Sequence, residues 1–169
     1  IFFVISGFLI TRQLAAGVAA NGIRELPSFY ANRIRRLLPA STVVVVATIV
    51  MAYLVAPPLR VKAITIDAIY TTFYGLNYRL AFAGTDYQHQ NDAVSPLQHF
   101  WSLGVEEQFY ILWPILIVAA AVLGRRYRTS ALVVILLAMG GTSFWYSATT
   151  TVASPSMAYF SLHTRAWEL

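Results

Sequence analysis

Long apolar runs without charge constrain this chain more than any other feature. Residues 37–59 and 130–148 contain no charged residue, and residues 100–123 carry no charge apart from one acidic pair. A helix of about 20 apolar residues is long enough to cross the hydrocarbon core of a bilayer. Hydrophobic residues make up 58% of the chain and charged residues only 11%, whereas soluble domains carry about 25% charge. We therefore predict an all-α fold, a polytopic transmembrane helical bundle.

The segments between these runs predict less regular structure. Residues 1–10 are apolar but too short to span, which predicts the second half of a helix, and residues 11–27 are polar and predict a loop or loose helix. A polar connector is expected at residues 149–156, followed by the start of one more helix at 157–169. Since the chain lacks an initial Met and stops within a promising segment, we expect one integral-membrane domain, residues 1–169, that continues at both ends.

Two arginine clusters flank the apolar runs and bear on topology. Basic residues beside a membrane helix favour the cytoplasmic side, and both clusters indicate topology rather than a nucleic-acid surface. The first cluster precedes residues 37–59 and the second follows residues 100–123: Arg33, Arg35 and Arg36, then Arg125, Arg126 and Arg128. An even number of crossings must separate two cytoplasmic clusters, yet residues 61–82 are a third candidate span. Either residues 61–82 are re-entrant or interfacial, or the second cluster faces outside.

The most unusual stretch is residues 95–114, where Glu106 and Glu107 lie inside an apolar run. Ionisable groups at membrane depth are unfavourable and by default indicate function. On a helix, His99, Ser102 and Glu106 would share one stripe, because positions three and four apart lie on one face. Such carboxylates could act as acid, base or anchor for a cation. The alternative is a purely structural ion pair with an arginine elsewhere in the bundle, such as Arg79 or Arg165.

The other charged residues also have two interpretations. The cluster Arg33, Arg35 and Arg36 could bind phosphates bidentately, or could serve topology and contact anionic lipid. Arg165 and Glu168, three residues apart, could pair with each other or belong to a site. We find no spacing typical of metal ligands and no phosphate-binding glycine loop.

Four blocks of this sequence resemble, in order, the acyltransferase 3 family of bacterial multi-pass membrane O-acyltransferases. They are FFVISGFLIT at residues 2–11, FYANRIRRLLPA at 29–40, HFWSLGVEEQFYILWP at 99–114 and YFSLHTRAWEL at 159–169. The third block is the most specific, and together the blocks cover nearly the whole chain. The resemblance implies about ten membrane helices in the full protein, which lies in the bacterial cytoplasmic (inner) membrane.

The resemblance also implies a reaction and its partners. An acyl group, often acetyl, would move from cytoplasmic acyl-CoA to a hydroxyl of a cell-surface glycan or lipid-linked acceptor. Acyl-CoA would be a substrate, with no permanently bound cofactor and no metal. The residues carried over are expected to act in catalysis (His99, Ser102, Glu106, Glu107), in binding the donor phosphates (Arg33, Arg35, Arg36) and in binding substrate (Trp101, Tyr110, Arg165, Glu168).

This sequence departs from the family pattern in two respects. Asn32 stands where many relatives have a further arginine. Family members also carry an Arg and a His in a first membrane helix, the His being the leading candidate for the base, and this chain starts downstream of it. We therefore expect the chain alone to be inactive. A transporter or flippase that couples its carboxylates to protons or substrate is the alternative function, and a structural membrane subunit is a third.

Overall fold

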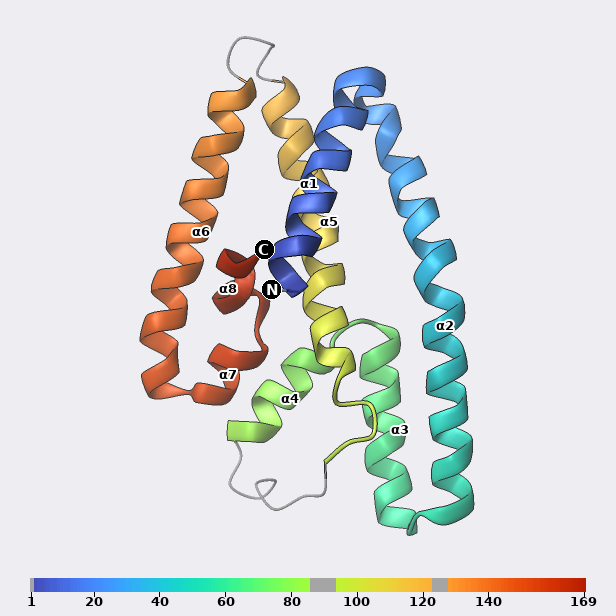
Figure 1. Cartoon of the computed structure of the whole chain (residues 1–169). Helices are drawn as coiled ribbons and strands as arrows, with labels where there is room; N and C mark the ends of the chain where they lie inside the picture. Colours follow the sequence, from blue (N-terminus) through green and yellow to red (C-terminus); the bar gives the residue numbers. More distant parts are fainter. Residues whose placement is uncertain (1, 86–93, 123–127) are drawn as a thin grey trace.

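The computed structural model describes residues 2–85, 94–122 and 128–169, and the regular structure of these residues is entirely helical. The chain opens with a hairpin of two helices, α1 (Phe2–Asn21) and α2 (Glu25–Val55), joined by the short 3-10 helix η1 (Gly22–Arg24) (Figure 1). Gly22 takes a φ of 61°, which glycine adopts without steric penalty. Residues 11–27, expected as a loop or loose helix, are helical: α1 continues because its alanine-rich sequence favours helix and because Leu14 and Val18 are buried.

The predicted span at residues 37–59 is the second half of α2, which starts 12 residues earlier. The helix ends at Val55, and Ala56 and Pro57 adopt extended backbone. A residue before proline is disfavoured in the helical region, and proline has no N–H to donate. Pro58 instead starts the next helix, a position where its missing N–H is not needed.

The ambiguous segment at residues 61–84 forms two short helices rather than one span. They are α3 (Pro58–Thr72) and α4 (Leu76–Thr85), with 15 and 10 residues, and each is shorter than the roughly 20 residues of a crossing. Two charged residues that interrupt the segment pair with each other, since Arg79 Nε donates to Asp67 Oδ1 at 2.5 Å. Both helices pack beside the lower half of the bundle (Figure 1).

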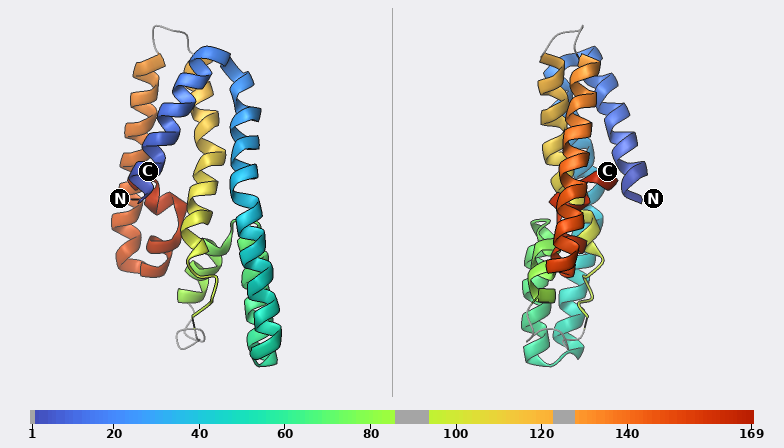
Figure 2. Two further views of the ribbon diagram at one scale, coloured as in Figure 1. Left: turned by 45° about the vertical axis from the view of Figure 1, so that its right-hand side comes forward. Right: turned by 90° about the vertical axis from the view of Figure 1, so that its left-hand side faces the viewer.

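The interruption between α3 and α4 bears on the number of membrane crossings between the two arginine clusters. Among the described residues between the two arginine clusters, the helices long and apolar enough to cross a membrane are α2 and α5 (Phe100–Val122), which stand side by side in the upper part of the bundle (Figure 1). The end of α5 and the start of α6 (Arg128–Ala153) therefore lie at the same end of the bundle as the α1–α2 turn, as both views in Figure 2 show. Arg125 and Arg126 themselves lie outside the described residues. Of the two topologies considered, the structure agrees with the one in which residues 61–82 do not cross.

The C-terminal part differs from the sequence prediction in two places. The connector expected at residues 149–156 is largely helix, because α6 continues to Ala153. Threonine hydroxyls in this part donate to carbonyls one turn back, Thr149 Oγ1 to Trp145 at 3.0 Å and Thr151 Oγ1 to Ser147 at 2.6 Å. The single helix expected at residues 157–169 is broken at Ser161 into α7 (Pro155–Phe160) and α8 (Leu162–Arg165), followed by η2 (Ala166–Glu168).

The hydrophobic core is centred on α5. Three described stretches are long and apolar enough to cross a membrane: Phe3–Val55, Phe100–Ala121 and Thr129–Ala153. Half of the α5 stretch is buried, against 11% of the α1–α2 stretch and 6% of the α6 stretch. Phe109, Trp113 and Ile117 of α5 pack against Ile10 and Leu14 of α1. The outer helices thus present apolar faces outward, as a helix in lipid or against further helices does.

Candidate functional site

Three consecutive polar residues of α5, Glu106, Glu107 and Gln108, point toward three different parts of the fold. Successive residues of a helix are rotated by about 100°, so neighbours in sequence contact different elements. Glu106 lies on the side of α1, Glu107 pairs with α2, and Gln108 binds α4 and the turn before it. This triplet is therefore where the polar contacts between helices converge within the apolar bundle.

Glu107 forms an ion pair with Arg33 of α2. Arg33 Nε donates to Glu107 Oε1 at 2.9 Å, and the two side chains are only 18% and 13% exposed. The same guanidinium lies 3.4 Å from the ring centroid of Tyr110, a cation–π contact. A charge-assisted hydrogen bond is about twice as strong as a neutral one. The structural pairing that we considered for the carboxylates thus exists, but its partner is Arg33 rather than Arg79 or Arg165.

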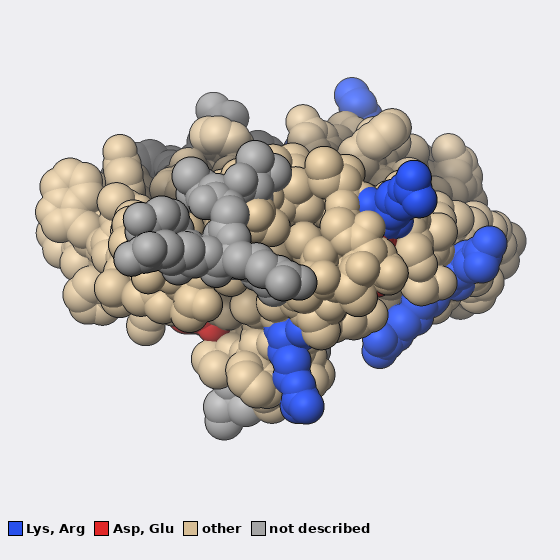
Figure 3. All heavy atoms as spheres, turned by 90° about the horizontal axis from the view of Figure 1, so that it is seen from above, with Lys and Arg blue, Asp and Glu red and all other residues tan. Residues whose placement is uncertain are grey.

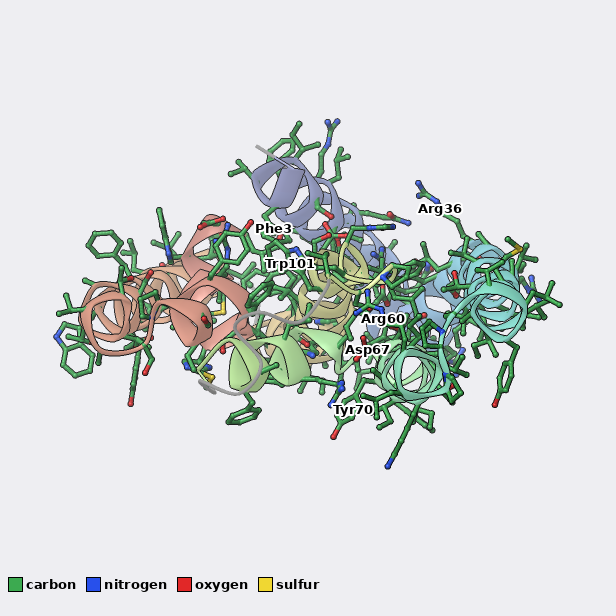
Figure 4. All side chains as sticks on the ribbon, turned by 90° about the horizontal axis from the view of Figure 1, so that it is seen from below. Phe3, Arg36, Arg60, Asp67, Tyr70 and Trp101 are labelled. Atoms are coloured by element: carbon green, nitrogen blue, oxygen red, sulfur yellow. The ribbon has the colours of Figure 1, made fainter. Side chains whose placement is uncertain are left out.

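The first arginine cluster is divided by this ion pair. Arg33 is turned into the bundle, whereas Arg35 and Arg36 are exposed. Arg36 extends outward from α2 in the view from below (Figure 4). From above, Lys and Arg side chains project over the side of the molecule that α2 occupies, and acidic side chains are almost covered (Figure 3). A ligand phosphate could reach Arg35 and Arg36 without breaking a buried pair.

Glu106 is buried next to α1. It is 4% exposed, and its Oε1 has no hydrogen-bond partner among the described residues. Tyr110, one turn along α5, shares a hydrogen bond between its hydroxyl and Ser6 Oγ. An unpaired buried carboxyl oxygen is unfavourable, and native structures rarely keep one without a reason. This oxygen can therefore still accept a hydrogen bond, from a substrate or from another part of the protein.

Gln108 ties α5 to α4 through an amide pair with Asn77. Gln108 Nε2 donates to Asn77 Oδ1 at 2.9 Å and to the Tyr74 carbonyl at 2.7 Å, and Asn77 Nδ2 donates to the Phe160 carbonyl at 3.1 Å. Asn77 is completely buried. The helices approach closely here because residue 104 is glycine: a Cβ on Gly104 would lie 3.0 Å from the Tyr74 oxygen. Nothing in the sequence indicated a role for Tyr74.

A cavity of about 70 Å³ lies beside the Arg33–Glu107 pair. One part of its wall is polar and aromatic and the other aliphatic. Its lining consists of Tyr30, Arg33, Ile34, Leu37, Tyr74, Glu107, Tyr110 and Ile111. A larger groove of about 500 Å³ lies between the end of α2 and α3, near Tyr53 and Lys62. Tyr53 is 20 residues from Arg33 along α2, roughly 30 Å at 1.5 Å per residue, so that groove is remote from the carboxylates.

A second cluster surrounds Arg165 at the α8 end. Arg165 Nη2 donates to Glu168 Oε2 at 2.8 Å, so the two side chains pair with each other, one of the two interpretations considered. Its guanidinium lies 5.1 Å from the ring centroid of Tyr159 and 5.6 Å from those of Trp101 and Phe3. Phe3 and Trp101 face each other between α1 and α5 (Figure 4). The structure thus brings Trp101, Arg165 and Glu168 together, whereas Tyr110 belongs to the Arg33 cluster.

His99 and Ser102 stand apart from the buried carboxylates. His99 precedes the first residue of α5 and is exposed, so it does not continue the helical stripe of Glu106. Ser102 Oγ donates to the His99 carbonyl at 3.2 Å, a local bond within the first turn. Neither side chain contacts Glu106 or Glu107 in a hydrogen bond described here.

Comparison with known proteins gives one family and several bacterial relatives. A family model described as an acyltransferase domain matches residues 1–166. The chain is 34% identical over its whole length to a Bacillus subtilis protein named "Putative peptidoglycan O-acetyltransferase YrhL", and 32% identical to the "Peptidoglycan O-acetyltransferase OatA" of Listeria monocytogenes. It spans 26% and 27% of the length of those two proteins. No solved structure matches the chain significantly.

Proposed function

This chain belongs to the acyltransferase 3 family, and from that membership we propose that it forms part of a membrane O-acyltransferase. The full protein would transfer an acetyl group from acyl-CoA to a hydroxyl of peptidoglycan or a related cell-surface glycan. The names of both relatives support the acetyl group and the acceptor, and the membrane-length helices support a place in the bacterial cytoplasmic membrane. The acyl-CoA donor follows from the family resemblance.

One observation supports an active site at α5 more than any other: charged groups are buried together where apolar helices meet. Glu106 and Glu107 lie within a membrane-length helix, with Arg33 and Tyr110 in contact with one another. Groups of this kind in a water-poor site interact strongly with charge that develops during a reaction. A helix that served only to span lipid would have no use for them.

The proposed reaction is a direct acyl transfer. The acceptor oxygen attacks the thioester carbonyl carbon, a C–O bond forms, the C–S bond breaks, and the hydroxyl proton passes through a base to the departing thiolate. No residue of the described chain is assigned as this base. Glu106, with its unpaired Oε1, would orient that base or the acceptor hydroxyl, and Glu107 would hold Arg33 in place. Arg35 and Arg36, both exposed, would bind the donor phosphates.

Acyl transfer by the full-length protein tests this proposal. We would incubate purified protein with radiolabelled acetyl-CoA and a peptidoglycan-type glycan, and measure alkali-labile acetyl ester together with free CoA. Glu106→Gln and Glu107→Gln should each lower the rate at least tenfold, while Glu25→Gln, on the α1–α2 turn, should not. Ester formation that is unchanged in both α5 variants at normal expression would refute their role. A transporter would form no ester at all.

A further inference from the structure

Tyr74, in the turn between α3 and α4, has a backbone conformation that bulky residues avoid. Its φ is 54°, the left-handed region, and it is the single described non-glycine residue with a positive φ. The next residue is Gly75, which would adopt such a conformation without steric penalty. Non-glycine residues in this region are strained, and such strain is retained where the surroundings enforce it, often at functional sites.

Three hydrogen bonds enforce this turn. The Tyr74 carbonyl accepts from Gln108 Nε2 at 2.7 Å, its N–H donates to the Thr71 carbonyl at 3.0 Å, and the Gly75 N–H donates to Tyr70 at 2.8 Å. The close approach of Gly104 keeps α5 against the same carbonyl. Local hydrogen bonds and contacts from α5 thus hold the turn together, and the residue of α5 that donates to it, Gln108, directly follows Glu107.

The strained turn carries the Tyr74 side chain into the cavity beside the ion pair. Tyr74 lines that cavity together with Arg33, Glu107 and Tyr110. Burial raises the pKa of Tyr74 above its usual 10 and the negative charge of Glu107 raises it further, while Arg33 and a hydrogen bond with Ser41 lower it. A phenol is neutral at physiological pH even at its usual pKa, so Tyr74 can donate a hydrogen bond. A neutral donor beside a guanidinium, in a cavity with an aliphatic wall, suits a small group with a carbonyl oxygen at one end and a methyl at the other.

We propose that Tyr74 is a further residue of the acyl-transfer site, a hydrogen-bond donor to the carbonyl oxygen of the acyl group bound in this cavity. This inference rests on the proposed function. In the attack by the acceptor hydroxyl, negative charge develops on that oxygen, and a preformed donor there stabilises the transition state. Gln108 is a positioning residue that acts through the Tyr74 turn. Neither residue was among those that the sequence pattern singled out for a role.

Two substitutions at residue 74 separate chemistry from packing. Tyr74→Phe keeps the ring and removes the donor, and Tyr74→Gly removes the ring while relieving the left-handed strain. In the full-length protein we expect both to lower kcat for acetyl transfer about 10- to 100-fold with KM for acetyl-CoA within about twofold. The unfolding midpoint of Tyr74→Gly should be unchanged or raised, because glycine tolerates this φ. Tyr70→Phe, one turn earlier and exposed, is the matched control and should behave like the parent.

A double substitution tests the role of Gln108. If Gln108 acts through Tyr74, the single substitution Gln108→Met should lower kcat. Added to Tyr74→Phe, it should lower kcat little further, because the effects of two residues that act on one interaction are not additive. Tyr74 variants that transfer acetyl at the parental rate, from an active parent, would overturn this inference and leave the proposed function intact. Fully additive losses would overturn the role of Gln108. A parent that transfers no acetyl group would overturn the proposed function, and this inference with it.

Discussion

Removal of Arg33 should reveal how strongly the buried ion pair shapes the bundle. Arg33→Met leaves Glu107 in a pocket where its side chain is only 13% exposed, with its partner at 2.9 Å gone. Breaking a buried pair on one side typically destabilises by 3–5 kcal/mol, because an uncompensated charge stays buried. The cavity of about 70 Å³ alongside has room for about two waters, at about 30 Å³ each, which would partly solvate the carboxylate. We therefore expect about 3 kcal/mol, the lower end of that range.

The double variant Arg33→Met, Glu107→Gln gives the decisive comparison. With no charge left in the pocket, it should be no less stable than Arg33→Met alone, although it carries one more substitution. The free energy of unfolding of the full-length protein would be measured by reversible denaturation in mixed micelles. Arg35→Met is the control: Arg35 is exposed, so the change should stay within about 0.5 kcal/mol. If the losses of the two single variants simply add, the pair is not coupled and the reasoning is refuted.

Other substitutions test the remaining contacts. Asn77→Leu leaves the Gln108 amide and the Phe160 carbonyl without this hydrogen-bond partner and should destabilise the fold by about 2 kcal/mol. An unchanged denaturation midpoint would contradict this. Gly104→Ala should destabilise by about 1–2 kcal/mol, since its Cβ would lie 3.0 Å from a carbonyl oxygen. The Cβ of Gly140→Ala meets nothing within 4 Å, so this variant should stabilise by up to about 1 kcal/mol. A stability change of the same sign in both variants would refute the close approach at Gly104. Arg35→Gln with Arg36→Gln should raise KM for acyl-CoA about tenfold with little change in thermal stability, and an unchanged KM would remove the two arginines from the donor site.

The apolar runs were sufficient to predict the helical class and most of the long helices. Residues 100–123 and 130–148 correspond to α5 and α6 within a few residues, because a long apolar segment in lipid must satisfy its own backbone as helix. The polar segments were predicted less well. Residues 11–27 were expected as a loop or loose helix and residues 149–156 as a polar connector, yet both segments are largely helical, and Leu14 of the first is buried.

The carboxylate pair could be found in the sequence but its contacts could not. An acidic pair in an apolar run is visible without any structure, since lipid penalises it. Its partner depends on which helix lies beside which face, and 74 residues separate Arg33 from Glu107. Tyr74 illustrates the same limit more strongly, because a backbone angle at a turn has no signature when the residue is not glycine.

The sequence by itself determined the membrane helices, the unusual carboxylates and the family, because hydrophobicity and local motifs are properties of contiguous residues. Only the tertiary structure decided that residues 61–82 turn back, that Arg33 rather than Arg79 or Arg165 pairs with Glu107, and that Tyr74 lines the cavity beside this pair. These are matters of packing between segments far apart in the chain, and helix periodicity alone does not specify which faces meet.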